Sequence, residues 1–189
     1  MSRARRHSDQ RLPGPAYPDS PIRVEVVHEF GPRSSAPRVQ ISPTNACAGV
    51  VVVARDPRQR IAVVRQFRAT LGTEMWELPR GFGRSKAPVD DAARELEEET
   101  GARAVRLQSL GAFHPDTGLQ RQQVVAVRAW VADAIARPIG TGEVAEVAWW
   151  SEPERHQAIV DGVLCDGISL AALLLDALTP AVPGDLVEA

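Results

Sequence analysis

The sequence predicts an α/β domain. Segments that read as strands alternate with helical segments, and this alternation is typical of α/β proteins. The chain has 189 residues, of which 44% are hydrophobic and 24% charged, an ordinary globular composition that allows a sizeable core. A glutamate-rich helical segment follows a glycine-containing turn in the middle of the chain, over residues 81–102. Its residues carry the strongest indication of function.

The composition excludes several functional classes. A net charge of −2 gives no argument for a nucleic-acid-binding or membrane-binding surface. No apolar run approaches the ~20 residues of a membrane span, and the first residues lack the apolar stretch of a signal peptide. Cys47 and Cys165 lie far apart without metal-ligand spacing, so we expect reduced thiols. The sequence therefore predicts a cytoplasmic protein without nucleic-acid or membrane partners.

The N-terminal part of the chain precedes the main domain. Residues 1–20 contain many Arg, Pro and Ser residues and little apolar content, which predicts a disordered tail. Residues 22–30 alternate apolar and polar side chains as a half-buried strand does. A loop at 31–37 and a second strand near 38–41 follow. We expect residues 21–45 to form a strand pair outside the core.

The core domain is expected over residues 46–180. Residues 48–54 are a continuous apolar run, as in a strand buried on both faces. Residues 56–60 form a turn. The other predicted strands are 61–68, 105–113, 122–132 and a strand within 142–151.

Two helices are expected near the C-terminus. Ser151 and Glu154 have the spacing of a capping box, which predicts a helix to about Val160. A last helix over residues 168–178 is capped by Asp166 and ends before Pro180, and residues 181–189 form a short tail. Its leucine stripe is predicted to pack in the core; the stripe comprises Leu170, Leu173, Leu174 and Leu178.

The central helix is predicted from its end signals. Pro88 suits the first helical position, where the missing N–H costs nothing. Asp90 and Asp91 place negative charge in the first turn, against the positive end of the helix dipole. Gly101 can close the helix in the left-handed conformation.

Three carboxylates share one face of this helix. Glu95, Glu98 and Glu99 stand at positions i, i+3 and i+4, and Arg94 can brace them. Such a run is more often a solvated face than a binding site. Like charges this close repel one another, however, and a hard cation such as Mg²⁺ between them relieves the repulsion. The flanking segments favour this second interpretation.

The segment R-E-L-E-E-E-T-G-A, Arg94–Ala102, resembles the second half of the Nudix box, G-x5-E-x7-R-E-U-x-E-E-x-G-U, where U is aliphatic. The first half departs from that pattern. Gly81 lies one residue too close to Arg94, and Lys86 or Ala87 stands where the box has its first glutamate. The missing glutamate leaves an alternative open: a Nudix-fold nucleotide-binding or regulatory module that is catalytically weak or inactive.

Flanking residues are similar to those of Nudix enzymes that hydrolyse ADP-ribose. The chain has R-Q-F-R at 65–68 and E-L-P-R-G at 77–81, where those enzymes have R-Q-[YF]-R and E-L-P-A-G. The resemblance implies an α/β/α sandwich with a mixed sheet and an N-terminal β-hairpin that often builds a homodimer. It also implies Mg²⁺-dependent hydrolysis, with Mn²⁺ as the alternative ion, of ADP-ribose or a related nucleoside diphosphate sugar. Dinucleotides and nucleoside triphosphates remain competing substrates.

The resemblance also implies roles for single residues. Glu95, Glu98 and Glu99 would hold the metal, together with the Arg80 carbonyl group. Arg68 and Glu77 would contact the substrate, and Arg65 is a weaker candidate, since a surface position is the plain alternative for each arginine. Substrate phosphates would lie near the turn at Gly81, and the loop with Pro115 would shape the pocket.

The catalytic base is expected from the segment after residue 142. The family commonly supplies a carboxylate from a loop followed by a strand at this point. Glu143 is the first candidate and Glu146 the alternative, while an edge-strand glutamate that faces water is the plain alternative for both. The catalytic residues implied are therefore Glu143 or Glu146, with Arg94 orienting the carboxylates.

Overall fold

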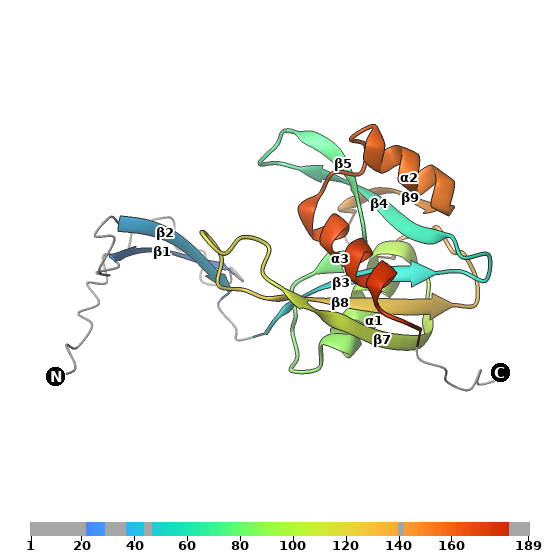
Figure 1. Ribbon diagram of the computed structural model, residues 1–189, viewed down its shortest axis with the longest axis horizontal. Coiled ribbons are helices and arrows are strands. Elements are labelled where there is room, and N and C mark those ends of the chain that lie inside the picture. Colours follow the sequence, from blue (N-terminus) through green and yellow to red (C-terminus); the bar gives the residue numbers. More distant parts are fainter. Residues whose placement is uncertain (1–21, 29–36, 44–46, 140–141, 182–189) are drawn as a thin grey trace.

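A computed structural model describes residues 22–28, 37–43, 47–139 and 142–181, and shows a sheet with helices on both faces (Figure 1). The tail predicted at 1–20 and nearly all of the tail predicted at 181–189 lie outside the described residues. The strands are β1 (Ile22–His28), β2 (Pro37–Pro43), β3 (Gly49–Arg55), β4 (Ile61–Arg68), β5 (Thr73–Glu77), β6 (Arg80–Gly81), β7 (Ala104–Phe113), β8 (Val124–Val131) and β9 (Val144–Trp150). The helices are α1 (Pro88–Thr100), α2 (Glu152–Val160) and α3 (Gly167–Leu178).

The main sheet is mixed and divides into two parts. In one part β3 pairs in parallel with β8. Strand β7 pairs antiparallel with β8, and strand β6 pairs antiparallel with β3. In the other part β4 pairs antiparallel with both β5 and β9. The parts pair directly only at Arg55 and Ile61, where β3 turns into β4. Away from this pair the two strands diverge, so Gly49 of β3 and Arg68 of β4 border an open space.

The core lies on both faces of β3, which is buried along almost its whole length. Because side chains alternate along a strand, Val50 and Val52 pack with α1 residues such as Leu96, whereas Val51 and Val53 pack with α3 residues such as Ala172. One helix thus covers each face of the sheet. The predicted α/β/α sandwich with a mixed sheet is confirmed.

The N-terminal hairpin extends from the main body (Figure 1). β1 and β2 pair antiparallel in continuous register, from Ile22 opposite Pro43 to His28 opposite Pro37. The hairpin contacts the domain at Ile41, whose N–H donates to the Leu119 carbonyl oxygen at 2.8 Å. The end of β2 is thereby placed beside the loop that follows β7.

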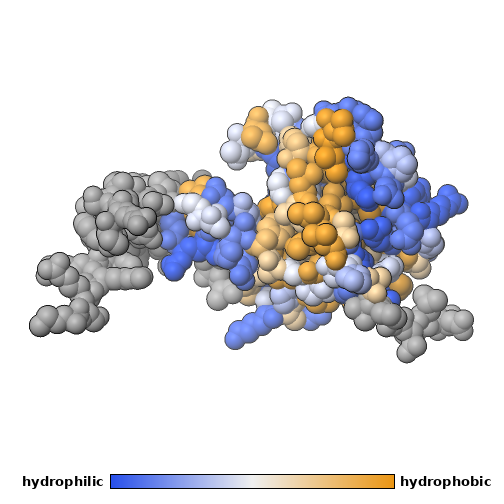
Figure 2. Space-filling model, in the orientation of Figure 1, coloured by the Kyte–Doolittle hydropathy of each residue, from blue (hydrophilic) through white to orange (hydrophobic). Residues whose placement is uncertain are grey.

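The leucine stripe of α3 is only partly buried, and the prediction that it packs in the core is wrong for Leu174 and Leu178. These two side chains are 59% and 71% exposed. Figure 2 shows hydrophobic surface in the region of α3. The helix instead turns Ala172 and Asp176 to the sheet. Asp176 accepts hydrogen bonds from Arg128, a buried residue of β8, and buried charges need such partners. The side of α3 that faces the sheet therefore combines this ion pair with apolar packing by residues such as Ala172 and Leu173.

Candidate active site

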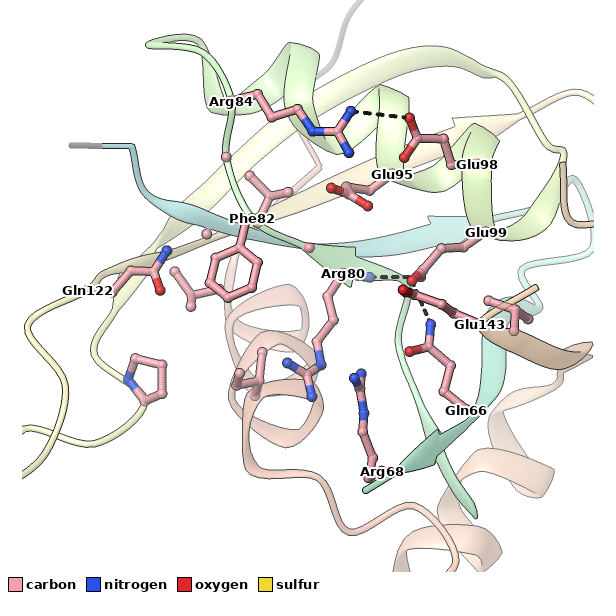
Figure 3. A pocket seen from close by; sticks show the side chains of 18 of the residues that line it. Gln66, Arg68, Arg80, Phe82, Arg84, Glu95, Glu98, Glu99, Gln122 and Glu143 are labelled. Atoms are coloured by element: carbon pink, nitrogen blue, oxygen red, sulfur yellow. Dashed lines mark hydrogen bonds and ion pairs between the residues drawn. The ribbon is translucent and has the colours of Figure 1, made fainter. Parts of the chain in front are cut away.

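A cavity of about 950 Å³ opens where β3 and β4 diverge (Figure 3). It is bordered by α1, by the turn at β6, by the loop after β7 and by the residues that precede β9. Most residues predicted for the site line this cavity, although they come from distant parts of the chain. They are Arg68, Arg80, Gly81, Glu95, Glu98, Glu99, Pro115 and Glu143.

Helix α1 presents its carboxylates to the cavity, and Arg94 holds two of them. The helix starts at Pro88, and Gly101 closes it with a φ of 77°, as predicted. The Arg94 guanidinium donates to Glu95 at 2.7 Å and to Glu98 at 2.8 Å. Arg94 does not line the cavity itself. Its hydrogen bonds orient Glu95 and Glu98, which line the cavity.

Glu99 is held by groups from outside the helix. Its carboxylate accepts a hydrogen bond from the Gln66 side chain at 2.6 Å and one from the backbone N–H of Arg80 at 3.0 Å (Figure 3). Burial raises the pKa of Glu99 to about 7. Burial also raises the pKa of Glu95, although Arg94 opposes the shift. Both shifts mean that the site penalises uncompensated negative charge, which a bound cation would relieve.

The turn at β6 lies directly against α1. A Cβ atom added at Gly81 would overlap the carboxyl group of Glu95, so glycine permits this close approach. Arg80 and Gly81 pair with Val51 and Val50 of β3. The predicted turn therefore contains a two-residue strand, and its pairing fixes the position of the Arg80 carbonyl group.

Glu77 is buried behind the cavity and does not line it. It is 1% exposed, and one of its oxygens accepts from Arg80 Nε and Nη2 at 3.0 and 2.8 Å. Its other oxygen accepts from Arg68 Nη2. The structure therefore places Glu77 where it orients two arginines.

The two candidates for the base occupy different positions. Glu143 lines the cavity, whereas Glu146 accepts hydrogen bonds from Arg65 at 2.8 and 3.1 Å and does not line it. Arg65 also lies outside the cavity, over the ring of Trp76. The β4–β9 register shifts between Arg65 and Gln66, and such bulges re-aim side chains. Of the two glutamates, only Glu143 borders the space that contains the carboxylates of α1.

Sequence reasoning missed several residues of the site. Gln66 stands two positions before Arg68 on β4, so strand alternation could have assigned both to one face and Arg65 to the other. Phe82 and Arg84 follow Gly81 and line the cavity, but no spacing rule identifies them. Asp91 was assigned only a helix-dipole role, although its carboxylate also accepts hydrogen bonds from Ser85.

The donor groups in the cavity fit a hard divalent cation. Among the residues that the structure describes, no three Asp, Glu, His or Cys side chains converge as a ready-made chelating group. Mg²⁺ needs no such cage, because it commonly takes one or two carboxylates and keeps several waters. Carboxylates from α1 and the Arg80 carbonyl group supply oxygen donors of this kind.

The chain is similar to several known proteins. Residues 46–161 match the NUDIX domain. An ADP-ribose pyrophosphatase of Mycobacterium tuberculosis (strain ATCC 25618 / H37Rv) is 29% identical over 175 residues, which cover 90% of this chain and 74% of that protein. An ADP-ribose pyrophosphatase of Bacillus subtilis (strain 168) is 39% identical over 70 residues, 36% of this chain and 38% of that one.

Two further similarities extend the comparison. A CMP-5'-(N-acetyl-N-hydroxy-3-aminopropyl)phosphonate hydrolase of Streptomyces rubellomurinus (strain ATCC 31215) is 30% identical over 118 residues, 62% of this chain and 57% of that protein. The crystal structure of an ADP compounds hydrolase superposes with a TM-score of 0.64 at 14% identity, over 83% of this chain and 84% of that one. At this identity the structural similarity supports the fold alone.

Proposed function

The chain belongs to the NUDIX family of hydrolases, and on that premise we propose that it hydrolyses the diphosphate linkage of ADP-ribose or a related nucleoside diphosphate sugar. The observation that carries the proposal is the cavity, which is lined by four glutamates and three arginines. Two of the similar proteins are named ADP-ribose pyrophosphatases, which supports this substrate class over a nucleoside triphosphate. From ADP-ribose the products would be AMP and ribose 5-phosphate.

We propose Mg²⁺ as the metal, with Mn²⁺ as the alternative. Glu95 and Glu99 would hold it, with Glu98 and the Arg80 carbonyl group as further oxygen ligands. A metal in this position lowers the pKa of water and offsets phosphate charge. Arg94 keeps Glu95 and Glu98 oriented through charge-assisted hydrogen bonds.

The protein's own groups would supply the remaining chemistry. Arg68 donates hydrogen bonds to the diphosphate, for which a planar guanidinium is suited. Glu143 takes a proton from the attacking water as general base. The glycine at position 81 lets the substrate and the turn approach α1 closely.

We propose two further properties, an oligomeric state and a cellular location. We expect a homodimer that uses the β1–β2 hairpin, because the hairpin extends from the main body and its residues Ile41 and Ser42 reach the cavity. We also expect a cytoplasmic protein. Within the described part of the chain, no helix has the length and apolar character needed to cross a membrane.

The competing function is a nucleotide-binding module without turnover, favoured by the missing first glutamate of the box. Hydrolysis of a substrate panel led by ADP-ribose distinguishes the two functions. Purified protein with Mg²⁺ is expected to release AMP, and Glu99→Gln is expected to abolish the release. Glu97→Gln is the matched control, because Glu97 lies on the same helix, pairs with Arg103 and does not line the cavity.

Each result of this assay has a clear meaning. Release of a different nucleoside monophosphate would keep the reaction and correct the substrate. No turnover of any panel member, with one nucleotide still raising the melting temperature, would establish the binding module instead. Equal turnover by wild type and Glu99→Gln would show that the metal assignment is wrong.

A further inference from the structure

Two arginines that line the cavity share a single buried carboxylate. Arg68 and Arg80 come from β4 and β6, and each donates to a different oxygen of Glu77. Arg80 also lies 3.7 Å from Asp166, which is too far for a direct hydrogen bond. Glu77 is therefore the carboxylate that hydrogen-bonds to both guanidinium groups, and Asp166 adds a second negative charge near Arg80.

The two guanidinium groups also keep unused donors. A guanidinium has five N–H donors in a planar fork. Glu77 accepts hydrogen bonds from Nε and Nη2 of Arg80 and from Nη2 of Arg68. The Nη1 atoms of both arginines make no hydrogen bond to a described residue. Arg68 Nε is buried and also lacks a partner among the described residues. Buried donors without partners are uncommon and indicate a ligand or water that completes the site.

The two guanidinium groups face the cavity opposite the carboxylates of α1. Figure 3 shows the guanidinium groups of Arg68 and Arg80 projecting into the space below Glu95 and Glu99. Both side chains are mostly buried, with 33% and 25% exposed. Low solvent exposure strengthens their attraction for an anion. The cavity therefore has an acidic side that suits a cation and, opposite it, guanidinium groups whose unused donors suit a phosphate.

At position 80 this chain differs from the motif of the enzymes that it resembles. In the motif E-L-P-A-G of the ADP-ribose-hydrolysing enzymes that the sequence resembles, alanine stands where this chain has Arg80. A ligand role for the Arg80 carbonyl group needs only backbone. The guanidinium is therefore available for a separate function.

We propose that the Arg80 guanidinium, paired with that of Arg68, binds a phosphate group of the substrate, and that buried Glu77 is the positioning residue for both. The phosphate lies between the two forks and accepts hydrogen bonds from the donors that Glu77 leaves free. Its identity as part of a hydrolysed diphosphate rests on the proposed function. Binding of the phosphate does not rest on that function, because Arg68 and Arg80 are in place whether or not the substrate is hydrolysed.

Binding of inorganic pyrophosphate tests this site without catalysis. Titration calorimetry in EDTA compares wild type with Arg80→Ala, Arg80→Lys and the control Arg103→Ala, whose side chain is 81% exposed and pairs with Glu97. We expect Arg80→Ala to weaken binding about ten- to a hundredfold, the range for a lost charge-assisted hydrogen bond. Arg80→Lys keeps a positive charge beside Glu77 but loses the planar set of donors of the guanidinium. We therefore expect this variant to fold but to bind pyrophosphate less tightly than the wild type.

The positioning role of Glu77 is tested by Glu77→Gln. We expect weaker pyrophosphate binding together with a raised KM and a nearly unchanged kcat, because the arginines lose their orientation while the carboxylates of α1 remain. Wild-type affinity in Arg80→Ala, or no pyrophosphate binding by the wild type, would overturn the proposal. Pyrophosphate binding without turnover of any nucleotide would instead overturn the proposed hydrolysis and leave the anion site in place.

Discussion

The carboxylate of Asp91 accepts hydrogen bonds from the backbone N–H and the hydroxyl group of Ser85, at 3.0 and 3.1 Å. Burial opposes ionisation of Asp91, but hydrogen bonds from Ser85 and the Arg84 backbone outweigh it and lower the pKa of this carboxyl. The same carboxylate lies 3.7 Å from Arg94. The chain lacks the first glutamate of the Nudix box, and Asp91 supplies a buried carboxylate between the shortened turn and the helix.

Replacement of Asp91 by alanine is expected to destabilise the turn and reduce activity. The Ser85 N–H would lose its partner, and because Ser85 is exposed and water can replace part of the bond, we expect a loss of about 0.5–1.5 kcal/mol. Urea unfolding and assay of the same preparations measure both effects. Asp90→Ala is the control, because Asp90 carries the same charge in the first helical turn but is exposed. Equal losses in both variants would show that only the helix dipole is involved.

Glu143→Gln is expected to lower kcat by about a hundredfold or more, the usual contribution of a general base. Glu146→Gln is expected to have little effect, because Glu146 pairs with Arg65 outside the cavity. Steady-state kinetics of both variants at saturating Mg²⁺ measures the difference. A large loss in Glu146→Gln with wild-type kcat in Glu143→Gln would reverse the assignment.

Gly81→Ala is expected to reduce turnover more than stability. The added methyl group would occupy the position of the Glu95 carboxyl group, which must then move away from its place beside the turn. Kinetic titration with Mg²⁺ is expected to show a raised metal requirement. Gly167→Ala provides the control, because a Cβ at that position meets no atom within 4 Å. Wild-type metal dependence in Gly81→Ala would contradict the close packing of turn and helix.

The metal-free protein is expected to lose stability as the pH rises through neutrality. Glu99 has a pKa of about 7 in the folded protein against an ordinary value of 4.5, so the folded state binds its proton more tightly. The resulting stabilisation is complete below about pH 4.5 and is lost as the pH rises through about 7. The raised pKa of Glu95 acts in the same direction.

Urea unfolding in EDTA at several pH values between 5 and 8 measures this loss. The free energy of unfolding is expected to fall less steeply in Glu99→Gln, because glutamine does not titrate. Glu97→Gln should keep the wild-type slope, since that position lies outside the cavity. Parallel curves for wild type and Glu99→Gln would show that Glu99 does not titrate in this range.

Local signals predicted the central helix and most strands from the sequence. Pro88 and Gly101 mark the ends of α1, and helical spacing alone places Glu95, Glu98 and Glu99 on one face. The apolar run of β3 likewise predicted burial on both faces. Each of these features depends on neighbours within a few residues, so the sequence contains all the information needed.

Contacts between distant segments could not be predicted in the same way. The spacing of Glu143 and Glu146 did not distinguish them, because the difference depends on strand packing: Glu143 precedes β9 and lines the cavity, whereas Glu146 lies on β9 opposite Arg65. The position of Glu77 behind the cavity depends on arginines from two strands. Leu174 is exposed while Asp176 is buried beside Arg128, and no leucine pattern reveals this arrangement.

The sequence by itself determined the family motif, the glutamate helix and the order of the elements, because periodicity and end signals act over one or two turns of chain. Only the tertiary structure decided which charged groups share the cavity. The pairing of β4 with β5 brings Arg68 to the buried Glu77, which also bonds to Arg80, and packing against α1 brings Glu99 to the backbone of Arg80. The distances between such groups depend on how whole elements pack, and that packing is a property of the complete fold.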